Sequence, residues 1–116
     1  MQKNYLKYKV EVFEMSEKIY TIEEIKENVK DILKKANVKK AILFGSYAKK
    51  NPTPKSDIDL VIDSDGKLLN IYFYGLLEDL VQKLQKKVDL IEISEIHKNS
   101  RIYNDIQKEG IIIYEQ

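Results

Sequence analysis

Apolar positions recur along the chain with two different periods, and the period separates the expected helices from the expected strands. Between residues 22 and 37 they recur at helical spacing, and Thr21 with Glu24 forms a capping box at the start. The same spacing predicts helices over about residues 68–87 and about 95–108. The positions expected to face the core are Ile22, Ile25, Val29, Ile32 and Leu33 in the first helix, Leu69, Leu76, Leu77, Leu80, Val81 and Leu84 in the second, and Ile96, Ile102, Tyr103 and Ile106 in the third.

Short apolar runs predict the strands. They cover residues 41–44, 88–93 and 111–114, and a fourth run opens at residue 57 with carboxylates alternating with apolar residues. Residues 65–66 are a turn signal, and residues 51–55 form a proline-containing flexible loop. The expected fold class is therefore α/β (α+β), with a small mixed β-sheet and helices packed on one face.

Two stretches allow more than one interpretation. Residues 1–20 alternate as a strand does until Phe13 breaks the pattern, so we expect an N-terminal arm or edge strand ahead of a domain over residues 21–116. Residues 71–74, Ile-Tyr-Phe-Tyr, are apolar on more of the helix than one buried stripe requires. They indicate either a helix buried on two sides or a partner-binding face.

The stretch between residues 41 and 60 carries the candidate chemistry. Its first run ends in Gly45-Ser46, where glycine permits a close backbone approach and Ser46 is expected to cap a short helix over residues 47–50. The free N–H groups of such a start favour a phosphate group. Asp57 and Asp59 share one face of the next strand, with Cα atoms about 6 to 7 Å apart.

Paired carboxylates beside a phosphate-binding turn suit a hard cation. Magnesium prefers oxygen ligands and binds through one or two carboxylates plus substrate phosphates, and two such ions can serve the attacking and leaving oxygens. Asp89, in a later strand, is the candidate third carboxylate, and Glu92 is its reserve. Asp89 also fits a purely structural carboxylate at a strand edge or a helix cap. Lys49, Lys50 and Lys55 fit phosphate neutralisation or a solvated surface, and the single histidine, His97, is assigned no role.

Gly-Ser, ten residues, then Asp-x-Asp resembles the motif of the DNA polymerase beta-like nucleotidyltransferases, and the small size resembles their minimal nucleotidyltransferase branch. The resemblance extends loosely from about residue 21 to the C-terminus, and it implies the polymerase beta-like nucleotidyltransferase fold for this part of the chain. It implies that Asp57, Asp59 and Asp89 are catalytic and hold two Mg²⁺ ions, and that Gly45, Ser46 and Lys49 bind the nucleotide. Ala48-Lys49-Lys50 departs from the Ala-Arg-Gly often found in this branch, because lysine lacks the planar two-pronged donor of arginine.

The resemblance further implies the reaction and the partner. AMP would pass from ATP to a hydroxyl, and many members of the branch are antitoxins that adenylylate a tyrosine of a HEPN-domain ribonuclease toxin. The rival interpretations are a binding antitoxin without turnover, which neutralises its partner by occlusion, and a transferase acting on a small molecule. A homo- or hetero-oligomer fits either antitoxin interpretation.

Length and composition limit the classes of partner that are expected. The 116 residues suffice for one domain but not for a separate acceptor domain, so a partner is expected to supply the acceptor. The 20 basic and 19 acidic residues nearly cancel, which disfavours nucleic acid as a partner. The absence of cysteine, of a signal peptide and of a long apolar span predicts a cytoplasmic protein without a membrane segment. The lysine-rich composition fits a thermophile or an AT-rich genome.

Overall fold

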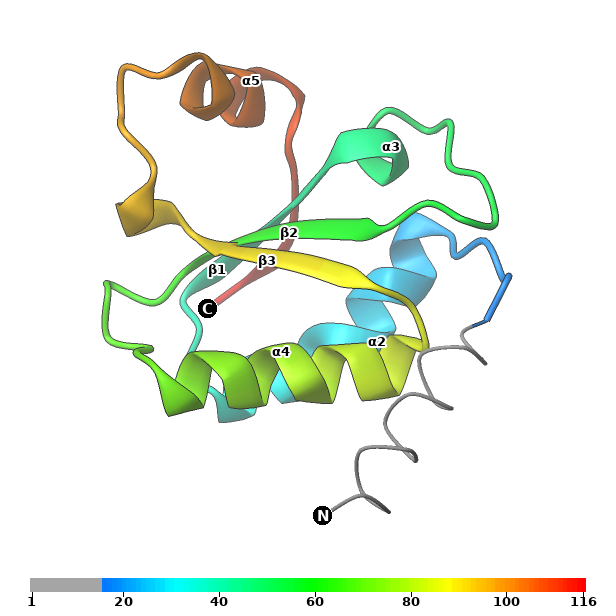
Figure 1. The fold of residues 1–116 in the computed structure, drawn as a ribbon, viewed down its shortest axis with the longest axis horizontal. Helices are drawn as coiled ribbons and strands as arrows, with labels where there is room; N and C mark the ends of the chain where they lie inside the picture. Colours follow the sequence, from blue (N-terminus) through cyan, green and yellow to red (C-terminus); the bar gives the residue numbers. More distant parts are fainter. Residues whose placement is uncertain (1–15) are drawn as a thin grey trace, which may run out of the picture.

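The computed structural model describes residues 16–116. The elements, in chain order (Figure 1), are helix α2 (Ile22–Lys35), strand β1 (Lys40–Phe44), short helix α3 (Gly45–Ala48), strand β2 (Ile58–Asp63), helix α4 (Ile71–Leu84), strand β3 (Val88–Glu92), 3-10 turn η1 (Ile93–Glu95), helix α5 (Arg101–Glu109) and strand β4 (Ile111–Glu115). Most of the expected N-terminal arm lies outside the described residues, and residues 16–20 form no helix or strand.

The strands form one mixed sheet. Their order is β3-β2-β1-β4, in which β1 runs antiparallel to β2 and β4 while β2 runs parallel to β3. The antiparallel pair β1 and β2 is joined by α3 and a long loop, so the C-terminal end of β1 lies beside the N-terminal end of β2. Helix α4 makes the crossover between the parallel strands, as such pairs require. The expected class, a small mixed sheet with helices, is confirmed.

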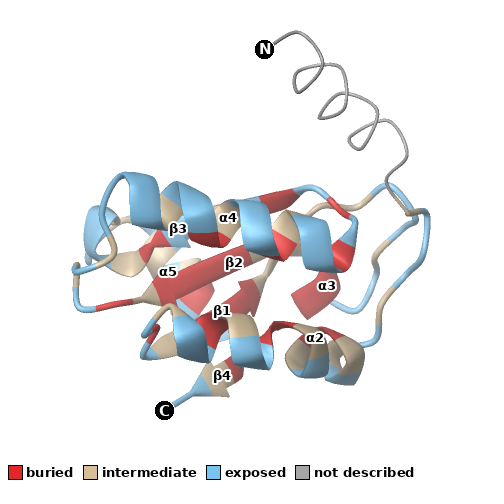
Figure 2. Cartoon of the chain, turned by 90° about the horizontal axis from the view of Figure 1, so that it is seen from below, coloured by how far each residue is buried: buried red, intermediate tan, exposed pale blue. Residues whose placement is uncertain are grey.

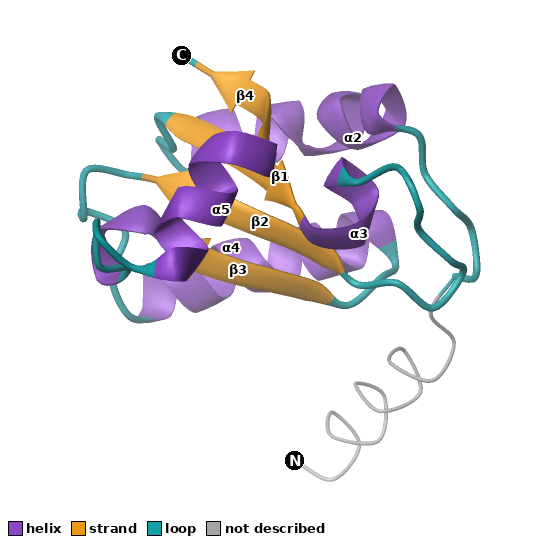
Figure 3. Cartoon of the chain, turned by 90° about the horizontal axis from the view of Figure 1, so that it is seen from above, coloured by secondary structure: helices purple, strands orange, loops and turns teal. Residues whose placement is uncertain are grey.

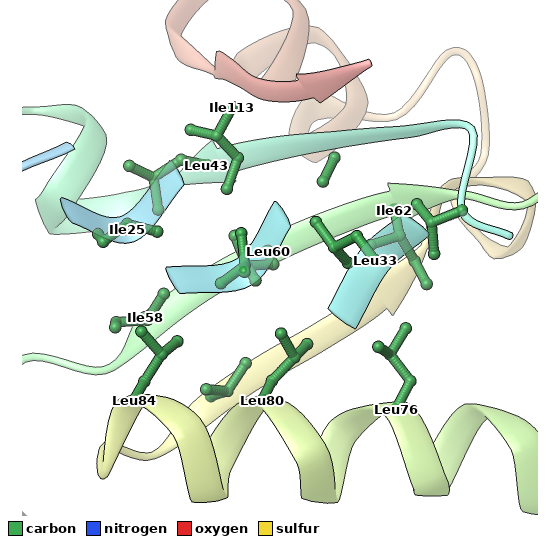
Figure 4. Close-up of a cluster of buried hydrophobic side chains, with 14 of the residues drawn as sticks. Ile25, Leu33, Leu43, Ile58, Leu60, Ile62, Leu76, Leu80, Leu84 and Ile113 are labelled. Atoms are coloured by element: carbon green, nitrogen blue, oxygen red, sulfur yellow. The ribbon is translucent and has the colours of Figure 1, made fainter. Parts of the chain in front are cut away.

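Two helices cover one face of the sheet. The capping box predicted for α2 is present, since Glu24 N donates to Thr21 Oγ1 and Thr21 N donates to Glu24 Oε1. Helices α2 and α4 turn their apolar stripes onto the strands, whose residues between them are buried (Figure 2). Figure 4 shows this cluster, in which Leu76, Leu80 and Leu84 of α4 face Ile58, Leu60 and Ile62 of β2. Burying a side chain of this size stabilises the fold by about 1.5–3 kcal/mol.

Helix α5 lies over the opposite face. Its Ile106 packs with Ile42 and Val61 in a second, smaller cluster. Figures 1 and 3 show α5 and α3 on this side of the sheet, away from α2 and α4. The expectation that the helices share one face therefore holds for the two long helices but not for α5, and the carboxylates of the sequence motif face this second, less covered side.

Helix α4 is shorter than expected. It begins at Ile71 rather than near residue 68, because Asp65, Gly66 and Asn70 all have positive φ and turn the chain before the helix starts. Leu69, expected to face the core, is 59% exposed. Ile71, Tyr72 and Tyr74 are 76%, 73% and 67% exposed, so the interpretation of residues 71–74 as buried on two sides is wrong.

Helix α5 also begins later than expected, at Arg101 instead of near residue 95. Ser100 caps it by accepting a hydrogen bond from Tyr103 N at 3.2 Å. The chain before it is held in the turn η1, where Glu92 accepts from Ser94 N, and Ile96 lies outside any helix. Ile102, expected to face inward, is 43% exposed. Among the described helices, none has the length and apolar character needed to cross a membrane.

Candidate active site

Two of the predicted carboxylates lie side by side. Asp59 of β2 pairs in register with Asp89 of β3 on one side and with Phe44 of β1 on the other. Asp57 stands immediately before β2, and the period of the strand puts it on the same face as Asp59. Because Ile58 points into the core, this face is the one that α5 only partly covers (Figure 3). The structure thus brings Asp59 and Asp89 together at one edge of the sheet, with Asp57 nearby on the same face.

Gly45 meets this edge at the end of β1. Its φ of +71° lies in the left-handed region, where a side chain is disfavoured. A Cβ at this position would overlap Asp59 Oδ2 and lie 3.1 Å from Asp59 Cγ. Glycine is therefore required both for the turn and for the close contact between the two halves of the sequence motif.

The electrostatics of the site are those of crowded carboxylates. Burial, together with hydrogen bonding to Asp89 and repulsion from the carboxylates of Asp89 and Asp57, raises the pKa of Asp59 to about 6, while Lys87 opposes the shift. Lys87 Nζ lies 3.8 Å from Asp57 Oδ2 in a largely exposed ion pair. The site thus holds negative charge, which the ammonium of Lys87 partly offsets.

The residues expected to bind the nucleotide, Gly45, Ser46 and Lys49, lie directly after β1. Ser46 lies inside the first turn of α3 and does not cap it, because the helix begins at Gly45 with Phe44 as its N-cap and no side-chain cap bond. Lys49 ends α3, and its Nζ lies 3.9 Å from Glu109 of α5. Tyr47 is buried and packs under the turn. Gly45 and Ser46 are therefore beside the carboxylates, whereas the side chain of Lys49 is engaged by α5.

An apolar cavity opens beside the carboxylates. It measures about 320 Å³ and lies between the sheet and α5. Its polar lining comes from Asp59 and Asp89, and the remainder is apolar: Phe44, Leu60, Val61, Leu90, Ile91, Ile102 and Ile106. A site with a few carboxylates at an otherwise apolar cavity fits a substrate group that has an apolar body and a reacting polar end.

Two other candidates lie apart from this edge. Glu92 is buried at the opposite end of β3 and accepts hydrogen bonds from Ser64 N, at 3.1 Å, and from Ser64 Oγ. These bonds fasten the β2–α4 turn to the end of β3, which is a structural role. His97 is exposed and lies in the connection before α5.

The donor set fits magnesium. Within residues 16–116 no group of three or more His, Cys, Asp or Glu side chains is arranged so that it could hold a metal ion. However, Asp59 and Asp89 offer adjacent oxygen donors whose mutual repulsion a cation would relieve. One or two carboxylates plus substrate phosphates are the usual magnesium ligands in such sites, so an open pair with Asp57 nearby is sufficient.

Two features of the site had no sequence signal. Lys86 and Lys87 fall at the end of the helix expected over residues 68–87. In the structure, however, Lys87 pairs with Asp57, and Lys86 is buried against the loop between the two halves of the motif. The apolar cavity has no sequence signal either, because its lining residue Ile102 has the spacing of a residue that faces the core. Both features depend on which segments meet in three dimensions.

Carboxylates on neighbouring strands, facing a glycine-dependent turn at the end of the preceding strand, are the arrangement that the sequence motif predicts for a nucleotidyltransferase. Comparison with known proteins gives the family. Residues 27–116 match the family described as Polymerase beta, Nucleotidyltransferase, and the chain belongs to it.

Its relatives include archaeal and bacterial proteins. It is 38% identical over 87 residues to "Putative protein adenylyltransferase MJ0435" of Methanocaldococcus jannaschii, covering 72% of this chain and 92% of the relative. It is 27% identical over 113 residues to "Protein adenylyltransferase MntA" of Aphanizomenon flos-aquae, covering 88% of this chain and 74% of the relative.

Solved structures show the same fold. A toxin–antitoxin structure with AMP-PNP superimposes with a TM-score of 0.68 at 22% identity, over 78% of this chain and 73% of the other. A tri-AMPylated Shewanella oneidensis HEPN toxin in complex with its MNT antitoxin gives a TM-score of 0.62 at 20% identity, over 79% and 71% of the two chains. The polymerase beta-like fold expected from the sequence is thus confirmed.

Proposed function

We propose that this nucleotidyltransferase is a magnesium-dependent protein adenylyltransferase, which moves AMP from ATP to a hydroxyl of a partner protein. The observation that carries the proposal is the register pairing of Asp59 with Asp89 beside Gly45. That the acceptor is a protein is supported by the names of the relatives, which are protein adenylyltransferases. A HEPN-domain toxin as partner is supported by the solved complexes that share the fold.

The reaction exchanges one bond to phosphorus for another. The acceptor oxygen bonds to the α-phosphorus of ATP, the bond from that phosphorus to the pyrophosphate oxygen breaks, and the hydroxyl proton is released. Asp57, Asp59 and Asp89 would hold magnesium, which when bound neutralises phosphate charge and makes the acceptor hydroxyl more acidic. Gly45 and Ser46 would orient the triphosphate through backbone N–H groups.

The apolar cavity supports an acceptor with an aromatic body. Asp89 lines that cavity, so its carboxylate is placed to take the proton of a hydroxyl entering there. Ile91 and Ile102, 37% and 43% exposed, would contact the ring of a tyrosine and exclude water from its hydroxyl. A sugar would leave these apolar walls without a matching surface.

A second interpretation rests on Lys49. If its ammonium stays with Glu109, 3.9 Å away, instead of moving to the triphosphate, nucleotide affinity would be low, and the protein would then neutralise its partner by occlusion. Calorimetric titration with Mg-ATP separates the two interpretations, since occlusion requires no nucleotide binding.

The decisive experiment mixes the purified protein with a HEPN-type partner, magnesium and ATP, and measures the mass of the partner. Addition of AMP to a tyrosine is expected with the wild-type protein and not with Asp59→Asn. Measured binding of Mg-ATP without any AMP on the partner would exclude the partner as acceptor.

A further inference from the structure

Lys86 is a buried lysine in the connection between α4 and β3. Its residue is only 3% exposed, although lysine is almost never fully buried unless it is paired. Among the described residues, no carboxylate oxygen lies within ion-pair distance of its Nζ, and burial lowers its pKa, with a weaker opposing effect of Glu17. Its Nζ donates a hydrogen bond to Pro54 O at 2.7 Å.

That acceptor belongs to the loop between the two halves of the sequence motif. Pro54 lies three positions before Asp57, on the part of the loop that leads into β2. The neighbouring Lys87 holds the same part of the chain twice more, because its carbonyl accepts from Ile58 N at 3.0 Å and its Nζ lies 3.8 Å from Asp57 Oδ2. The α4–β3 connection therefore contacts the approach to Asp57 at three points.

An apolar side chain would serve packing better than lysine here. A buried ammonium carries a desolvation cost, and the single hydrogen bond offsets only part of it. Pro54 is itself exposed, so water could satisfy its carbonyl without Lys86. A residue that breaks a local rule of stability in this way is expected where function requires it.

We propose that Lys86 is a positioning residue, whose hydrogen bond to Pro54 O fixes the loop so that the Asp57 carboxylate stays beside Asp59. The inference rests on the proposed function insofar as these carboxylates hold the metal. Groups that orient metal ligands typically change metal affinity or activity about 10- to 100-fold when removed. Lys86 acts through Asp57 and does not itself contact the substrate.

The test replaces Lys86 with methionine, which keeps the apolar stem and removes the ammonium. We expect amide hydrogen exchange of residues 53–57 to rise at least about tenfold, and Mn²⁺ affinity, measured by electron paramagnetic resonance, to fall at least about tenfold. Thermal stability should stay equal or rise, because a buried charge has been removed. Lys83→Met is the matched control: Lys83 is an exposed lysine near the end of α4, and its loss should change none of these quantities.

Lys86→Arg is the second variant, and it keeps the charge and the donors. A surface pocket of about 260 Å³, lined by Pro54, Asp57 and Lys86 among others, gives the longer side chain room. Its loop exchange and Mn²⁺ affinity should stay within about threefold of the wild type. If the methionine variant keeps wild-type exchange and affinity, or if both Lys86 variants lose stability and affinity in parallel, Lys86 has only a structural role.

The two proposals fail separately. A wild-type protein that binds Mn²⁺ but never adenylylates a partner contradicts the proposed acceptor and leaves the positioning result intact. A methionine variant that labels the partner with wild-type kcat and KM contradicts the role of Lys86 and leaves the proposed function intact. Loop exchange is read without any metal, so it decides the positioning role even where metal binding is absent.

Discussion

Gly45→Ala is the substitution for which the structure gives the clearest expected result. With a φ of +71°, alanine at this position must adopt the left-handed conformation, which costs about 1–2 kcal/mol. The new Cβ would also overlap Asp59 Oδ2 and lie 3.1 Å from Asp59 Cγ. The atoms that must move belong to a side chain and not to the backbone, so the overlap is relieved by displacing the Asp59 carboxylate.

The backbone strain and the displacement of the Asp59 carboxylate can be measured separately. The backbone cost lowers stability by about 1–2 kcal/mol, which for a domain of this size corresponds to a fall in Tm of roughly 4–8 °C. Displacement of the carboxylate should lower Mn²⁺ affinity at least about tenfold, because the ligand leaves its place beside Asp89. Circular dichroism melts without metal measure the first effect, and electron paramagnetic resonance titration with Mn²⁺ measures the second.

Gly66→Ala is the matched control. Gly66 has nearly the same φ, +69°, but the nearest atom to an added Cβ is Ser94 Oγ at 3.8 Å, an ordinary contact. We expect a similar fall in Tm and unchanged Mn²⁺ affinity. If Gly45→Ala binds Mn²⁺ as tightly as Gly66→Ala does, the contact between Gly45 and Asp59 does not shape the metal site and the reasoning is refuted.

Three further results are expected. The folded-state pKa of Asp59, about 6, lies above its ordinary value of 3.8, so the metal-free protein should lose stability as pH rises from about 4 to about 6. The loss in the free energy of unfolding is at most about 3 kcal/mol, and solvent screening of this partly exposed site reduces it to about 1 kcal/mol. Thermal melts in the presence of EDTA measure this loss, and Asp59→Asn should abolish it. Asp89→Asn should lower the rate of AMP transfer more than the affinity for Mg-ATP, and equal rates would leave Asp89 a structural residue. Tyr72→Glu should weaken binding of a HEPN-type partner, measured by calorimetry, while Mn²⁺ affinity stays unchanged; undiminished binding would exclude this exposed end of α4 as the docking face.

Local signals explain the parts of the fold that could be predicted. The capping box of Thr21 and Glu24 marked the start of α2, and alternation around Ile58 put Asp57 and Asp59 on one face. Helices α4 and α5 start later than the periodicity of apolar residues predicts, and both delays have local causes. Residues with positive φ, ending at Asn70, turn the chain before α4. The N-cap residue Ser100 sets the start of α5.

The candidate site could be predicted only in part, because its members come from separate segments. Gly45, Asp57 and Asp59 share one short stretch with a recognisable spacing. The place of Asp89 beside Asp59 depends on β3 pairing in parallel with β2 in one particular register, and this pairing joins segments about 30 residues apart, so that no local pattern reveals it. The burial of Lys86 depends further on where α4 ends.

The end of α4 therefore affects both Asp57 and Asp89, which come from separate segments of the chain. Gln85 adopts a left-handed conformation with a φ of +54° and stops the helix, so that Lys86 and Lys87 turn toward the loop before Asp57. Two residues later the same connection places Asp89 beside Asp59. The buried stripe of α4 fixes this end of the helix against the sheet, and Tyr20 Oη donates to Leu84 O at 2.7 Å. We therefore expect a substitution that shifts α4 along its axis to move Asp89 and the loop contacts together, so that the packing of this helix would determine the geometry of the proposed metal site.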